Sequence, residues 1–111
     1  MVRLKKTITI KDVQKLAERG LEILIKKGRH PEGNFGLYYP EEDEIRVYLP
    51  QHSSKKEIED TILHEYVHAL EGQRGFKGKI SHGEIDIVVN RTVRRRPKVI
   101  EFIKELYELD Y

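Results

Sequence analysis

The feature that most constrains this chain is the pattern His64-Glu65-Tyr66-Val67-His68, which lies inside an amphipathic helical repeat. Apolar residues recur there at helical spacing, at Ile58, Ile62, Leu63, Tyr66, Val67 and Leu70. A capping box, Ser54-x-x-Glu57, precedes this stripe, and Gly72 follows it. The sequence therefore predicts a helix that begins near residue 54 and ends near residue 72.

The pattern itself places side chains for metal chemistry. His64 and His68 are one helical turn apart on one face, so both imidazoles can bind a single ion. Glu65 lies beside the first imidazole and can reach a water molecule on that ion. Two histidines and a general base in this order are typical of zinc peptidases. With Thr61, these three residues are predicted to lie on the side of the helix opposite the apolar stripe.

Composition limits both the domain organisation and the kind of metal site. The chain has 111 residues, enough for one domain (residues 1–111), and 36% of them are charged with a net charge of only +2. It has no cysteine, so a metal must be held by His, Asp or Glu. No apolar run approaches the roughly 20 residues that span a bilayer. We expect a cytoplasmic protein with no membrane partner.

A zinc peptidase needs a third protein ligand, and three residues near position 82 are candidates. Glu71 is excluded, because seven residues of helix separate it from His64 by about 10 Å. We rank His82 first, because imidazole suits zinc and this residue begins the next predicted helix. Glu84 ranks second, since it also belongs to a capping box. Asp86 ranks third and could instead hydrogen-bond a ligand histidine.

The remaining segments predict an α+β fold with a small sheet. An amphipathic helix is expected from Val13 to Ile25, ended by Gly28, after an extended lead-in or strand at residues 3–10. Two aromatic and β-branched segments, 35–39 and 45–49, flank a turn and predict a β-hairpin. Further helices are expected over residues 81–93, where 85–89 could also be a strand, and over 99–111. His30 and His52 are interpreted as surface histidines.

At this point the chain resembles the minigluzincins, which are minimal zinc metallopeptidases, over its whole length. The segments His64–Ala69 and His82-Gly83 also resemble SprT-like peptidases, whose third ligand is a histidine in such a context, although the cysteines of a zinc ribbon are missing. Gluzincins more often use a glutamate, which keeps Glu84 as the alternative. The minigluzincin resemblance further implies a latent zymogen, in which residues 99–111 cover the cleft of their own molecule or of a homodimer partner. Plain core packing of that segment is the simpler expectation.

These observations together predict a zinc-dependent metalloendopeptidase acting on a peptide or protein substrate. Glu65 would be the general base, with Zn²⁺ on His64, His68 and His82. The strand at residues 45–49 would be the edge that pairs with an extended substrate. A second oxyanion donor is not identified, with Tyr39, Tyr48 or an arginine as candidates.

Two other classes of function stay open at this stage. One is a metal-binding module without peptidase activity. The other is a DNA-associated protease of the SprT-like type, which would use basic residues near the end of the third helix: Arg91, Arg94, Arg95, Arg96 and Lys98. The net charge of +2 gives no support to a dedicated nucleic-acid surface, so we do not expect a nucleic-acid partner.

Overall fold

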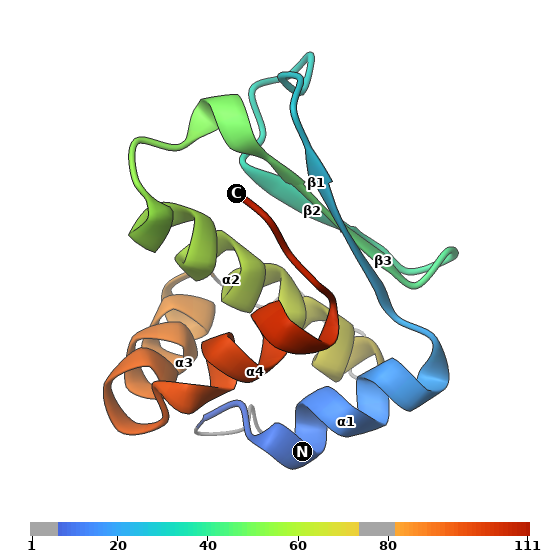
Figure 1. Cartoon of the computed structure of the whole chain (residues 1–111), viewed down its shortest axis with the longest axis vertical. Coiled ribbons are helices and arrows are strands. Elements are labelled where there is room, and N and C mark those ends of the chain that lie inside the picture. Colours follow the sequence, from blue (N-terminus) through green and yellow to red (C-terminus); the bar gives the residue numbers. More distant parts are fainter. Residues whose placement is uncertain (1–6, 74–81) are drawn as a thin grey trace.

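Four helices and a small mixed sheet form the structure, a computed structural model that describes residues 7–73 and 82–111. For Gly72, Gln73 and His82 it describes the backbone alone. The elements follow one another as α1 (Ile10–Arg19), β1 (Glu22–Lys26), β2 (Gly36–Tyr39), β3 (Glu44–Tyr48), a 3-10 turn (Leu49–Gln51), α2 (Lys55–Gln73), α3 (His82–Arg95) and α4 (Lys98–Leu106). The fold is α+β, as predicted, and the helices lie on one side of the sheet (Figure 1).

The first helix is shorter than its apolar periodicity predicted. Thr9 and Asp12 cap it reciprocally, with each side chain accepting from the other residue's backbone N–H. Gly20 then ends it in the left-handed conformation, at φ +107°, and its N–H donates to the carbonyls of Leu16 and Ala17. The prediction of a helix to Ile25 was therefore wrong, because the C-cap glycine is Gly20 and not Gly28.

The segment after Gly20 becomes a strand, and this changes which strand of the sheet is central. β2 and β3 form the predicted antiparallel hairpin, with Tyr38 opposite Ile45. β1 adds to the other side of β3 in parallel, with Ile23 opposite Ile45. The strand order is β1-β3-β2, so β3 is the middle strand and β2 is an edge. The prediction that residues 45–49 form the edge beside the cleft was wrong.

Helix α2 confirms the apolar stripe and its start signal. All six stripe residues are buried, and Tyr66 has no exposed surface. Ser54 Oγ accepts from the N–H of Glu57 at 3.2 Å, while the Glu57 carboxylate accepts from the N–H of Ser53 at 3.0 Å. The Ser54 half of the predicted box is therefore present, but Glu57 accepts from Ser53 N–H, one residue earlier than the box requires.

Helices α3 and α4 close the other side of the core. In α3, Ile85, Val88 and Val89 are buried, which settles residues 85–89 as helix rather than strand. Residues 7–9 form no strand, and residues 1–6 and Ser81 lie outside the described part of the chain. Thr92 of α3 anchors the N-terminal segment, because its buried hydroxyl accepts from Ile8 N at 2.9 Å.

The C-terminal segment packs as part of the core. α4 buries three of its apolar residues, Val99, Ile100 and Ile103, and ends at Leu106 rather than at the chain terminus. After it, Tyr111 OH donates to Glu59 Oε2 at 3.2 Å. Glu59 lies nine residues before His68, about two and a half turns, so it is on the opposite side of α2. Figure 1 shows the chain end running along α2 toward the sheet.

No helix in the described part of the chain is long and apolar enough to cross a membrane.

Candidate active site

The two motif histidines lie together on one face of α2. Their ring centres are 5.3 Å apart and the ring planes are inclined at 61°. Two imidazoles on one tetrahedral zinc ion, with Zn–N bonds of about 2.0–2.1 Å, have ring centres roughly 5 Å apart. Both residues are half-buried, which leaves them reachable from solvent. The pair therefore fits a shared metal ion.

Glu65 is more enclosed than the predicted polar face implied. Its residue is only 7% exposed, because the edge strand β2 crosses α2 at this point. Burial raises the pKa of Glu65 to about 7, since the apolar surroundings disfavour the carboxylate. A cation on the neighbouring histidines would lower that pKa again. Without a bound cation, the pKa of this carboxyl group therefore lies near neutral pH, close to the operating pH at which a general base works best.

The close crossing of β2 over α2 depends on Gly36. A Cβ atom at this position would lie 2.6 Å from Thr61 Cγ2, 3.1 Å from Arg46 O and 3.4 Å from Glu65 Cγ. Any side chain would push the strand away from the helix. Gly36 therefore allows the sheet edge to lie directly beside the carboxylate of Glu65.

A pocket of about 390 Å³ opens between this strand, α2 and α3. Its walls are the loop and start of β2 (Gly33, Asn34, Phe35 and Gly36), the exposed side of α2 (Asp60, Thr61, His64 and Glu65) and one side of α3 (Asp86, Val89 and Asn90). No residue of α4 or of the segment after it is among these lining residues. The described structure thus supports core packing of residues 99–111 and does not place them over the pocket.

The candidates for the third ligand separate by their position on α3. Asp86 Oδ1 lies 3.8 Å from His64 Nδ1, so this face of α3 is turned toward the motif. His82 begins α3 four residues earlier, and only its backbone is described. Glu84 is exposed and lies two residues before Asp86, so it is not on the face of α3 that carries Asp86.

A complete ligand set is not present among the described side chains. In that part of the chain, no group of three His, Asp or Glu residues is placed to hold a metal ion. Asp86 is near His64, and whether it is a third ligand or a partner of that histidine stays a prediction. The side chain of His82 lies outside the described part, so its ranking as first candidate stays a prediction.

His52 was interpreted as a surface histidine, but the structure places it between the sheet and α2. Its Nδ1 lies 3.0 Å from Tyr48 O, and its Nε2 lies 2.8 Å from Thr61 Oγ1. Phe35 packs edge-on against the same ring. The turn that follows β3, which contains Pro50, brings His52 back toward the sheet. The contact of His52 with Thr61 joins two separate elements, so the local sequence could not indicate it.

His30 likewise has polar partners, which its loop position did not reveal. Its Nδ1 accepts from the N–H of Glu32 at 3.1 Å and lies 3.2 Å from Asn34 Nδ2. The His30 ring also packs edge-on against Tyr48. His30 therefore stabilises the loop whose residues Asn34 and Phe35 line the pocket.

Two other groups considered from sequence lie away from the pocket. Tyr39 and Tyr48, the candidate oxyanion donors, are not among its described lining residues. The exposed basic residues Arg94, Arg95, Arg96 and Lys98 gather where α3 meets α4, and Arg96 Nε donates to Thr7 Oγ1. They are likewise absent from the lining of the pocket.

Comparison with family models, curated proteins and solved structures found no match to this chain. The interpretation of the site therefore depends on its residues and their geometry.

Proposed function

We propose that the chain is a zinc-dependent metallopeptidase in which His64, His68 and His82 bind the ion. The observation that carries this proposal is the pair of imidazoles 5.3 Å apart on one turn of α2, of which His64 lines an open pocket together with Glu65. Asp86 Oδ1, 3.8 Å from His64 Nδ1, is too far for a hydrogen bond, but its negative charge would strengthen that imidazole as a ligand.

The residues of the site divide the chemistry between them. When bound there, zinc supplies Lewis acidity, which lowers the pKa of a water molecule to about 7 and polarises the peptide carbonyl. Glu65 accepts the proton that this water loses and returns it to the leaving amine nitrogen. The enclosure of Glu65 under β2 leaves only 7% of the residue exposed, which limits its contact with bulk water to the side that faces the pocket.

The outer edge of β2, which pairs with no other strand in the described part of the chain, supports an extended peptide as the substrate. Tyr48 N donates to Phe35 O at 2.9 Å, so the backbone groups of Phe35 face β3. Hydrogen-bonding direction alternates along an antiparallel strand, which turns the N–H and C=O groups of Gly36 and Tyr38 away from β3. A peptide added as a further strand would pair with these groups and pass beside Glu65.

The test separates metal binding from catalysis. Wild-type protein, Glu65→Gln and a control at an exposed glutamate, Glu41→Gln, are loaded with zinc and incubated with casein and a peptide library. We expect equal zinc content in all three, and cleavage by all but Glu65→Gln. Full cleavage by Glu65→Gln would refute its role as base. Zinc bound by a wild type that cleaves nothing would identify a metal-binding module instead.

The third ligand has its own comparison. His82→Ala is expected to lose zinc, measured by elemental analysis after dialysis, and Glu84→Ala to keep it. Unchanged zinc content in His82→Ala, with loss in Glu84→Ala, would transfer the role to Glu84.

A further inference from the structure

The edge strand β2 is attached to α2 at two places, one on each side of the metal-binding motif. At the first, Gly36 lies against Thr61, three residues before His64. At the second, a polar cluster joins the other end of the strand to the carbonyl of Ala69, which directly follows His68. The strand therefore crosses the motif between these two contacts with α2.

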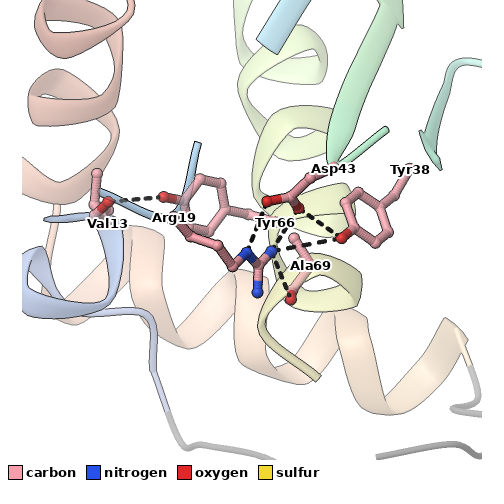
Figure 2. A network of polar contacts seen from close by, with 6 residues as sticks. All are labelled: Val13, Arg19, Tyr38, Asp43, Tyr66 and Ala69. Carbon is pink, nitrogen blue, oxygen red and sulfur yellow. Dashed lines mark hydrogen bonds and ion pairs between the residues drawn. The ribbon is translucent and has the colours of Figure 1, made fainter. Parts of the chain in front are cut away.

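Arg19, the last residue of α1, is the centre of the second attachment (Figure 2). Its Nε and Nη2 donate to the two oxygens of Asp43 at 2.7 and 2.6 Å, which is the bidentate geometry of a strong ion pair. The same Nη2 lies 3.5 Å from Tyr38 OH and 3.5 Å from Ala69 O. One guanidinium thus joins the hairpin turn, the edge strand and the motif helix.

Tyr38 and Asp43 are arranged to complete this cluster. Tyr38 OH donates to Asp43 Oδ1 at 2.7 Å, and burial followed by that bond raises the pKa of Tyr38 to about 12. The phenol therefore keeps its proton and remains a donor at neutral pH. Asp43 has φ +52°, a left-handed conformation that aspartate tolerates better than most residues.

We propose that Arg19, with Asp43 and Tyr38, is a positioning clamp that holds β2 at a fixed distance from α2, so that a peptide paired with β2 is presented to Glu65. This inference rests on the proposed peptidase function. Arg19 is not among the described residues that line the pocket, so it acts through the strand and does not touch the substrate.

An ion pair between α4 and α2 gives a matched control for the clamp. Lys104 Nζ lies 3.2 Å from Glu59 Oε2, with side chains 28% and 24% exposed, against 27% and 22% for Arg19 and Asp43. Glu59 lies on the side of α2 opposite His68. Breaking either pair should lower the melting temperature, but only loss of the clamp should change how a peptide is held.

The experiment measures KM and kcat on one extended peptide for wild type, Arg19→Gln, Asp43→Asn and Glu59→Gln. We expect KM to rise about tenfold in Arg19→Gln and less in Asp43→Asn, which keeps a neutral acceptor at this position. Zinc affinity, from competition with a chromophoric chelator, should stay within about twofold. Equal KM values in Arg19→Gln and Glu59→Gln would overturn the clamp.

Amide hydrogen exchange of β2 tests the same clamp without catalysis. The N–H groups of Leu37 and Tyr39 should exchange at least about tenfold faster in Arg19→Gln than in Glu59→Gln. Unchanged exchange would overturn the clamp even if the wild type is active. If the wild type cleaves no peptide but exchange differs as expected, the proposed function fails while the attachment of β2 by Arg19 stands.

Discussion

Replacing Gly36 by alanine should separate the sheet edge from the motif helix. The new Cβ would lie 2.6 Å from Thr61 Cγ2, about 1 Å closer than the ordinary carbon–carbon contact of about 3.5–4.0 Å. It would also lie 3.1 Å from the carbonyl oxygen of Arg46, which belongs to the neighbouring strand and cannot rotate away. Overpacking of this kind costs about 1–3 kcal/mol.

The measurement is urea unfolding of a double-mutant cycle with Thr61→Ser. Serine lacks the Cγ2 methyl that meets the new Cβ but keeps the hydroxyl that lies 2.8 Å from His52 Nε2. Gly36→Ala should therefore destabilise less in the serine background, with a coupling energy of about 0.5–3 kcal/mol. The contact with Arg46 O remains, so recovery should be partial.

Gly28→Ala supplies the control, because nothing lies within 4 Å of a Cβ at that position. This variant should stay within about 0.5 kcal/mol of the wild type. If Gly36→Ala is as stable as Gly28→Ala, the claim that β2 lies too close to α2 for a side chain at position 36 is wrong. The same conclusion follows if Thr61→Ser gives no recovery.

Three further changes test other contacts. Burial alone would raise the pKa of Asp43, but the hydrogen bonds from Arg19 and Tyr38 and the charge of Arg19 together outweigh burial and lower that pKa. The stabilisation from these contacts is complete well above pH about 4 and is lost as pH falls through the lowered pKa, so Asp43→Asn should flatten the acid side of a stability–pH curve. Thr92→Val removes the acceptor of Ile8 N–H and should cost about 1–3 kcal/mol in urea unfolding; an unchanged midpoint would contradict the role of that bond. Free zinc at 100 times Kd should stabilise the wild type by about 2.7 kcal/mol in thermal unfolding, and equal stabilisation of His68→Ala would count against the metal site.

Local signals predicted the elements that carry the site. The apolar stripe and Ser54 cap of α2, the aromatic strands of the hairpin and the sequence of the motif all depend on neighbours within a few residues. The helix, its apolar stripe and the hairpin were confirmed where the chain is described, and the motif lies on that helix as predicted, while its binding of a metal stays a prediction. The end of α1 was missed, because Leu21, Leu24 and Ile25 fit a helical period and a strand equally well, and the decisive residue was Gly20.

The rest depended on contacts between distant segments. Parallel pairing of β1 with β3 puts β3 in the middle of the sheet and leaves β2 at the edge. No property of residues 45–49 alone could indicate that this segment is the middle strand. The partners of His52 and Arg19 come from α2 and from the hairpin turn, many residues away. Burial of Glu65 likewise arises from a glycine in another element.

By itself, the sequence determined that two imidazoles and a carboxylate share one turn of a capped helix, because helix geometry fixes the spacing of residues four apart. Only the tertiary structure decided what surrounds them. Gly36 lets the edge strand lie against Glu65, and Arg19 ties that strand to the same helix beyond His68. The enclosure of the carboxylate and the direction of the open pocket are properties of packing, which local spacing does not encode.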